Sequence, residues 1–305
     1  MSHPFKCVAY LFCQSKGGLS KLRFDIVTHV NYAFAIPTRD GRVLPLERPE
    51  LARAVVEKAH AGGAKACLSL GGWSYEDVPL EAAFREATDT PEKTAGLAEE
   101  IAAMAEKFGF DGVDVDWEYP RAGDGSKAQY EALIDLLHRR LKPKGMLLTA
   151  AVIGGVDAAG RPLRDPAEAQ DRPSFDKLDW LNVMTYDSGE DRHSTCEYAE
   201  NCMRYWVENR GFDPEKLTLG LPFYGRPAPA PFHLRLDAHP DALDKDMVVL
   251  NGKEVWYNGR DTLCKKVALA KRLGLGGIMI WEISEDCQDI DHSLLTVLEQ
   301  AVAGR

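Results

Sequence analysis

The sequence predicts an α/β protein built as a single (β/α)8 TIM barrel, and three observations carry this prediction. Short apolar segments of strand length recur along the 305 residues, they alternate with longer segments of helical period, and no low-complexity linker divides the chain. Strands are expected at 5–12, 28–36, 65–71, 112–118, 147–153, 179–187, 217–224 and 276–282. Eight parallel strands with helices outside close into a barrel.

Local residues mark where several of the intervening helices begin and end. Helices are expected at approximately 50–62, 91–108, 126–141, 197–209, 260–273 and 291–303. Thr90-Pro91 is expected to begin one helix, Gly109 and Gly211 to end two, and Asp291 to cap the last. A doubly wound nucleotide-binding sheet is not favoured, because the glycines at 274–277 follow a helix and do not begin one.

One excursion interrupts the alternation between the seventh and eighth strands. It contains the Pro-rich stretch 227–231, a polar segment to Asp246 and an expected hairpin through Asn251-Gly252. Because it is only about 30 residues long, we expect a short insertion and not a full α+β insertion domain.

Composition excludes several functions. Lys and Arg number 37 and Asp and Glu 47, a formal charge of −10 that disfavours nucleic acid as a partner. No apolar run approaches the length of a membrane span, so no membrane partner is expected. Seven cysteines without a Cys-x-x-Cys pair fit a reducing compartment, and Met1–Lys6 does not resemble a signal peptide. As written, the chain is expected to be cytoplasmic, or secreted if it is a mature or leaderless form. It is also expected to be monomeric and free of cofactors.

The run Asp111-Gly112-Val113-Asp114-Val115-Asp116-Trp117-Glu118 is the most informative segment. Side chains alternate across a strand, so the carboxyls of Asp114, Asp116 and Glu118 share one face, while the valines and the tryptophan take the other. Like charges roughly 7 Å apart repel, and burial disfavours ionisation, so the trio is expected to retain a proton. Glycoside hydrolysis needs such a protonated carboxyl near neutral pH.

Three simpler interpretations of the charged and thiol residues are less consistent with the sequence. A solvated acidic edge strand would leave Val113, Val115 and Trp117 without an apolar partner. A calcium loop needs glycine at its sixth position, where this chain has Tyr119. His193, Cys196 and Cys202 could form half a zinc site, but their spacing is loose and no second pair completes it. No metal site is therefore expected.

The chain resembles glycoside hydrolase family 18, the chitinase family. The acidic run fits that family's D-x-x-D-x-D-x-E signature, including the terminal Glu. Further segments typical of the family follow in the expected order: Ser69–Gly72, Met184–Asp187, Leu219–Arg226 and Gly277–Glu282. The resemblance covers nearly the whole chain and implies one catalytic domain, 1–305.

The resemblance implies a retaining mechanism in which the substrate supplies its own nucleophile. Glu118 would protonate the glycosidic oxygen while the N-acetyl carbonyl oxygen attacks the anomeric carbon. Asp116 would share a proton with Glu118 or stabilise the acetamide N–H, and Asp114 would lie deeper and keep that proton available. Tyr186 would hold the acetamide oxygen in line for attack.

The same resemblance implies a set of residues that bind the sugar. Trp281 would form the floor beneath the −1 sugar, and Asp187 would bond the sugar or its acetamide. Further contacts are expected from Tyr10, Phe34, Ser69, Met184 and Trp73, while Trp256 could be a subsite or part of the packing. The expected partner is an oligo- or polysaccharide that contains N-acetylglucosamine.

The short insertion sets this chain apart from many chitinases, in which a larger domain forms one wall of a deep groove. A shallower cleft and endo-type, non-processive cleavage are therefore expected. Endo-β-N-acetylglucosaminidase and peptidoglycan glucosaminidase activities use the same acids, so the sequence does not separate them. A sugar-binding lectin is the alternative from another class, but lectins of this family usually lose the acid that Glu118 provides.

Overall fold

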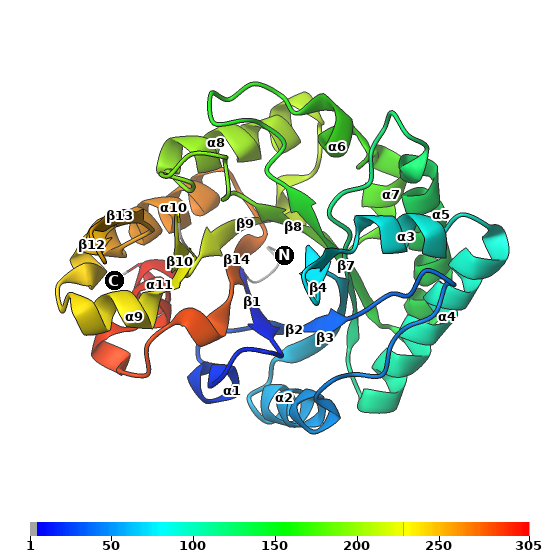
Figure 1. Cartoon of the computed structure of the whole chain (residues 1–305), viewed down its shortest axis with the longest axis horizontal. Helices are drawn as coiled ribbons and strands as arrows, with labels where there is room; N and C mark the ends of the chain where they lie inside the picture. Colours follow the sequence, from blue (N-terminus) through cyan, green and yellow to red (C-terminus); the bar gives the residue numbers. More distant parts are fainter. Residues whose placement is uncertain (1–4, 228, 305) are drawn as a thin grey trace.

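The fold is a closed barrel of eight parallel strands, seen in a computed structural model that describes residues 5–227 and 229–304 (Figure 1). Around the barrel the order is β1-β14-β9-β8-β7-β6-β3-β2, and each pairing is parallel. The strands are β1 Lys6–Phe12, β2 His29–Ala35, β3 Lys65–Gly71, β6 Gly112–Asp116, β7 Leu147–Ile153, β8 Trp180–Met184, β9 Leu217–Pro222 and β14 Gly277–Trp281. The predicted TIM barrel is confirmed.

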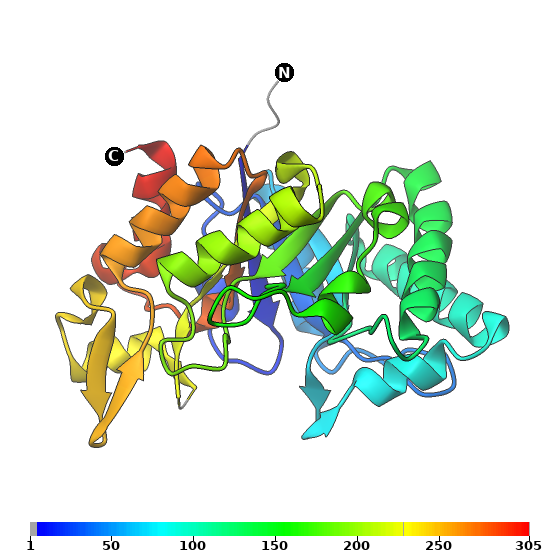
Figure 2. The same ribbon diagram turned by 90° about the horizontal axis from the view of Figure 1, so that it is seen from above.

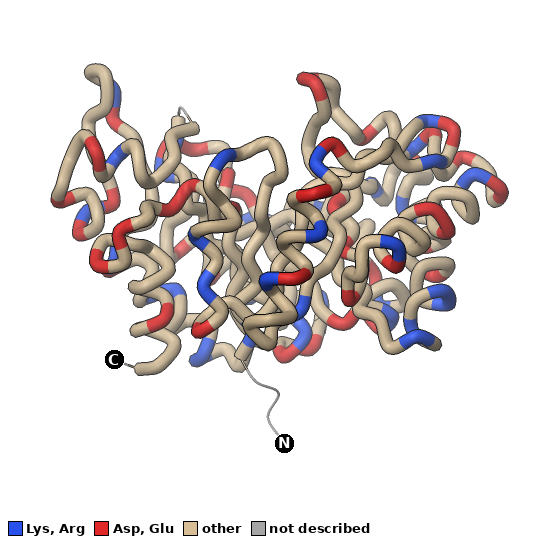
Figure 3. Tube along the Cα trace, turned by 90° about the horizontal axis from the view of Figure 1, so that it is seen from below, with Lys and Arg blue, Asp and Glu red and all other residues tan. Residues whose placement is uncertain are grey.

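The long helices cover the outside of the barrel, where Lys and Arg are interspersed with Asp and Glu (Figure 3). They are α2 Pro49–Ala61, α4 Pro91–Phe108, α5 Ser126–Leu141, α8 Cys196–Arg204, α10 Arg260–Arg272 and α11 Leu294–Ala303. Shorter helices are α1 Gly18–Lys21, α3 Glu81–Ala87, α6 Arg164–Glu168, α7 Arg172–Lys177 and α9 Phe232–Ala238. Within the described ranges, no helix is both long enough and apolar enough to span a bilayer.

Helix ends follow the predicted residues with two differences. The Thr90 side chain caps α4, and Gly109 ends it with φ 81°. Asp291 does not cap the last helix: Ser293 does, because 290–292 form a separate 3₁₀ turn that delays the helix start to Leu294. The helix expected at 197–209 ends as α8 at Arg204 and continues as a π-helical turn over 205–209.

Strand alternation places the acidic residues of β6 as predicted. Asp114 points into the barrel beside Ser69 of β3 and Thr149 of β7, its register partners. On the opposite face, Trp117 lies under the helices and stacks on Phe84 of α3, with ring centroids 4.8 Å apart. β6 therefore has a polar inner face and an apolar outer face, which is what a barrel strand requires.

A glycine lets β3 approach β6 at the mouth of the barrel. Gly71 has φ 117°, and a Cβ there would lie 2.2 Å from the carbonyl oxygen of Asp116. The next amide, that of Gly72, donates a hydrogen bond to the same oxygen at 2.8 Å. Only glycine fits at position 71. The Gly71-Gly72 pair therefore fixes the position of the Asp116 carbonyl group at the end of β6.

Two hairpins project from the face opposite the two chain ends (Figure 2). One is β4 Ser74–Tyr75 with β5 Val78–Pro79, which follows β3. The other is β12 Met247–Leu250 with β13 Lys253–Trp256, which turns at Asn251-Gly252 with positive φ at both residues. The second hairpin, with α9 and the small sheet of β10 Tyr224–Gly225 and β11 Ala230–Pro231, forms the predicted short insertion.

Candidate active site

A cavity of about 910 Å³ opens at the carboxyl ends of the barrel strands. This is the end at which TIM barrels carry their active sites. All of the predicted site residues except Asp114 and Ser69 line it: Tyr10, Phe34, Trp73, Asp116, Glu118, Met184, Tyr186, Asp187 and Trp281. With Ala151 and Ile153 of β7 and Tyr224 after β9, which also line it, all eight barrel strands or the segments after them contribute to this cavity.

Asp114 and Ser69 lie behind the cavity wall and belong to a buried hydrogen-bond network. The Asp114 carboxylate accepts from Ser69 Oγ and Tyr10 Oη, both at 2.8 Å, from Thr149 Oγ1 at 2.6 Å and from Asn182 Nδ2 at 3.2 Å. Burial raises the pKa of Asp114, and these hydrogen bonds oppose the rise. The network fixes the strand that carries the other two acids.

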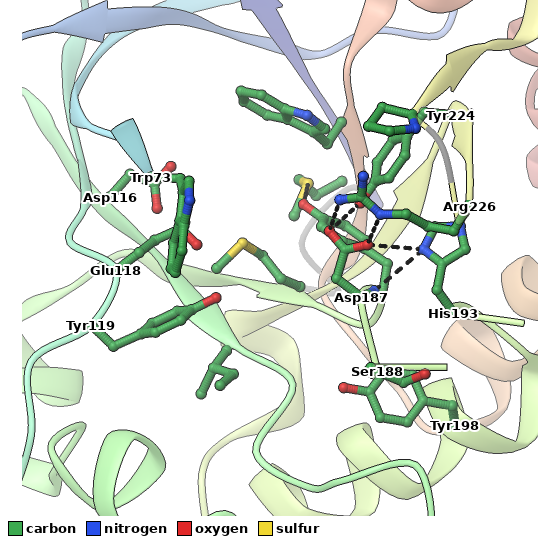
Figure 4. A pocket seen from close by; sticks show the side chains of 18 of the residues that line it. Trp73, Asp116, Glu118, Tyr119, Asp187, Ser188, His193, Tyr198, Tyr224 and Arg226 are labelled. Atoms are coloured by element: carbon green, nitrogen blue, oxygen red, sulfur yellow. Dashed lines mark hydrogen bonds and ion pairs between the residues drawn. The ribbon is translucent and has the colours of Figure 1, made fainter. Parts of the chain in front are cut away.

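Asp116 and Glu118 face the cavity, one at the end of β6 and one just beyond it (Figure 4). Asp116 is 3% exposed, and its Oδ1 has no hydrogen-bond partner among the described residues. Burial, with the charges of Glu118 and Asp114, raises the pKa of Asp116 well above its usual value. Burial also raises the pKa of Glu118 to about 7, with the charge of Asp187 adding to it and a hydrogen bond from Tyr119 opposing it. The two carboxyls thus retain a proton near neutral pH.

Tyr186 presents a neutral phenol to the same cavity. Its hydroxyl lies 3.8 Å from Met279 Sδ, a weak acceptor, and its ring meets Tyr224 edge to face. Burial and the charges of Asp116 and Glu118 raise its pKa well above the usual value for tyrosine. The hydroxyl is therefore a hydrogen-bond donor available to a ligand.

An aromatic surface forms the floor of the cavity. The indole of Trp281 stacks on Phe34, with centroids 5.6 Å apart and planes at 21°, and Tyr10 and Phe12 also lie against it. These rings bring the ends of β1, β2 and β14 together. Flat apolar faces of this kind suit the C–H face of a pyranose.

Across the cavity from the acids, Asp187 is held by three side chains (Figure 4). Its carboxylate accepts from Tyr224 Oη at 2.6 Å and from Arg226 Nε and Nη2 at 2.7 and 2.8 Å, and His193 Nδ1 lies 3.2 Å away. Although burial opposes ionisation, these partners hold the pKa of Asp187 well below its usual range. Asp187 is thus a fixed anion beside the catalytic candidates.

Sequence reasoning did not identify Tyr224, Arg226 or His193 as site residues. Tyr224 and Arg226 lie two positions apart in the strand-seven segment typical of the family. That spacing could have predicted that their side chains lie on the same side of the chain. No sequence pattern could have predicted the contact of His193 with Asp187, because only the tertiary fold brings the two together. It belongs to no zinc site: in residues 5–227 and 229–304, no three His, Cys, Asp or Glu residues are arranged to hold a metal.

The two candidate tryptophan subsites differ in position. Trp73 lines the cavity just before the β4–β5 hairpin and is 60% exposed. Trp256 instead lines a second cavity of about 260 Å³, where Arg192 lies over its ring with the guanidinium carbon 4.7 Å from the centroid. Only Trp73 has a free face toward the main cavity.

Known proteins resemble the chain over most of its length. The sequence profile described as glycosyl hydrolases family 18 matches residues 6–286. The chain is 30% identical to a chitinase-like effector from Moniliophthora roreri, over 68% of this chain and 54% of that protein. It is 29% identical to chitinase B from Serratia marcescens, over 70% of this chain and 44% of that protein. It therefore spans about half the length of these two relatives.

The solved structures include one of similar length. The crystal structure of the family 18 chitinase ChiB from the chitin utilization locus of Flavobacterium johnsoniae has a TM-score of 0.83 and 28% sequence identity to this chain. The match covers 99% of this chain and 95% of that one. The barrel and its short insertion thus have a counterpart of matching size.

Proposed function

Because the chain belongs to glycosyl hydrolases family 18, and is thereby a glycoside hydrolase, we propose that it is a chitinase. Its substrates would be polymers or oligomers of β-1,4-linked N-acetylglucosamine, cleaved with retention of the anomeric configuration. One observation carries the proposal: Asp116 and Glu118, with raised pKa values, line the same cavity as the Tyr186 hydroxyl and the indole of Trp281.

Glu118 is the general acid of the proposed reaction. Its carboxyl retains a proton near neutral pH and gives it to the glycosidic oxygen as the bond to the anomeric carbon breaks. The leaving sugar departs as an alcohol. Glu118, now a carboxylate, then accepts a proton from the water that attacks the intermediate from the same face.

The substrate supplies the nucleophile in this proposal. The acetamide oxygen of the −1 sugar attacks the anomeric carbon and gives an oxazolinium ion, oriented by the Tyr186 hydroxyl. Asp116, whose Oδ1 has no hydrogen-bond partner among the described residues, would accept the acetamide N–H, whose positive charge grows during the attack. Asp187 would contact the sugar from the opposite wall.

Endo-type and non-processive action is supported by the short insertion. The insertion is short, and neither α9 nor the β12–β13 hairpin contributes a residue to the lining of the main cavity, so long chains could enter and leave the cleft along its length. A lectin role is disfavoured by Glu118, because a binding protein needs no carboxyl protonated at neutral pH.

The test replaces Glu118 by glutamine, which keeps the size of the side chain and removes its proton. Glu118→Gln should bind chitotetraose with a Kd within about threefold of the parent and lose at least about 10³-fold in kcat. Exposed Glu168→Gln on α6 is the matched control and should behave as the parent. Retention of more than a tenth of the parent kcat in Glu118→Gln would contradict the assignment.

A further inference from the structure

Lys266 of α10 is fully buried, and none of its three hydrogen-bond acceptors is charged. Its Nζ donates to the carbonyl oxygen of Ser194 at 2.8 Å, to Ser194 Oγ at 2.6 Å and to Asn258 Oδ1 at 2.7 Å. Burial lowers the pKa of Lys266 to about 7. Burying an ammonium group in this environment costs folding free energy. A lysine at this position therefore indicates a role that offsets the cost.

The acceptors of Lys266 join three separate parts of the chain. Ser194 Oγ donates in turn to the carbonyl oxygen of Thr185, which directly precedes Tyr186 and Asp187, at 2.8 Å. Asn258 Nδ2 donates to the carbonyl oxygen of Ser194, also at 2.8 Å. The ammonium group is thus the junction of the end of β8, the loop that follows it and the end of the insertion.

The loop 187–193 forms one wall of the main cavity. Asp187 begins it with φ 55°, a left-handed conformation that is unfavourable for aspartate. His193 ends the loop. Its Nδ1 lies 3.2 Å from Asp187 Oδ1, and the carbonyl oxygen of His193 accepts a hydrogen bond from the amide of Ser188. Ser194, the next residue, is therefore where the closed loop is attached to the rest of the protein.

We propose that Lys266 is a positioning residue that holds both ends of loop 187–193 through Ser194 and thereby fixes Tyr186 and Asp187 against the −1 sugar. Lys266 touches neither the cavity nor the reacting atoms. A neutral side chain of this length cannot donate three hydrogen bonds from one atom, which accounts for the buried charge. The proposal deepens the proposed function and rests on it.

The test compares Lys266→Met with Lys265→Met, the same substitution at the exposed neighbour on the same helix. Amide hydrogen exchange is measured for peptides covering 185–194 and, as an internal reference, for β2. In Lys266→Met, exchange in 185–194 should be at least tenfold faster and exchange in β2 unchanged. On chitotetraose, kcat should fall at least tenfold and KM stay within twofold, since Trp281 and Trp73 still bind. Lys265→Met should match the parent in both measurements.

Ser194→Ala provides a second variant, which removes one acceptor and the link to Thr185 but leaves the lysine. It should show the same local increase in exchange. Parent-like exchange in 185–194 of both variants overturns the proposal, and so does an equal increase in β2, because that describes general destabilisation. If the parent cleaves no N-acetylglucosamine substrate, the proposed function fails, and the exchange comparison still decides whether Lys266 holds the loop.

Discussion

Arg226 binds Asp187 with two parallel hydrogen bonds at the mouth of the barrel, Nε to Oδ1 at 2.7 Å and Nη2 to Oδ2 at 2.8 Å. A planar guanidinium matches a carboxylate in this geometry and lysine does not. Tyr224 of β10, two residues before Arg226, donates to the same carboxylate. The orientation of Asp187 toward the cavity thus depends on residues that follow β9.

Replacing Arg226 by lysine should therefore lower activity even though the charge is kept. We expect kcat/KM on chitotetraose to fall by about 10- to 100-fold, because Asp187 loses its fixed orientation. Arg204→Lys on α8, an exposed arginine paired with Glu200, is the control and should leave kcat/KM unchanged. Parent-like kinetics in Arg226→Lys would show that the paired geometry is not needed.

The pH dependence of activity should reflect the proton on Glu118. A general acid must be protonated to act, and burial raises the pKa of Glu118 to about 7. Activity should therefore be present below that pH and fall as the pH rises through it. Measured as kcat/KM between pH 4 and 9, the alkaline limb should have its midpoint near pH 7. A limb below pH 5 would mean that Glu118 titrates like an exposed carboxyl.

Asp116→Asn should change both the rate and this alkaline limb. The asparagine cannot share a proton with Glu118, and it removes the repulsion between the two carboxylates, which raises the pKa of Asp116 and, being mutual, favours a proton on the pair. We expect kcat to fall by about 10- to 10³-fold and the alkaline limb to move to lower pH by about one unit. The control is Asp176→Asn, on the exposed surface of α7. A limb that moves to higher pH would contradict the coupling of the two acids.

Trp73 should contribute binding and not chemistry. Trp73 is 60% exposed, so Trp73→Ala removes an aromatic platform without opening a hole in the core. KM for chitohexaose should rise by about fivefold or more, with kcat within twofold. Val78→Ala, on the same hairpin but outside the cavity, is the matched control. Equal KM values for Trp73→Ala and the parent would show that Trp73 does not bind the substrate.

The sequence was sufficient to predict those parts of the site that depend on local periodicity. Alternation is a property of any strand, so the common face of Asp114 and Asp116 in β6 was predicted without knowledge of the fold. Glu118 lies just beyond the strand, which ends at Asp116 and not at 118 as expected. The pairing of Asp187 with Arg226 could not be predicted in this way, because the two lie 39 residues apart and meet only where the segments after β8 and β9 fold against each other. The prediction of the α11 cap was wrong for a different reason. Asp291 and Ser293 are both good capping residues, and the 3₁₀ turn over 290–292 leaves Ser293 at the start of the helix.

The strictest test of the substrate-assisted mechanism changes the substrate and leaves the protein intact. A chitooligosaccharide with a free amine in place of the −1 N-acetyl group still fits over Trp281 but lacks the oxygen that attacks the anomeric carbon. Cleavage at that linkage should fall by at least about 10³-fold, because the proposed mechanism takes its nucleophile from the substrate. Mass spectrometry of products from singly deacetylated chitotetraoses gives the cleavage position, and the fully acetylated tetraose is the control. Cleavage after a deacetylated −1 sugar at more than a tenth of the control rate would require a nucleophile from the enzyme.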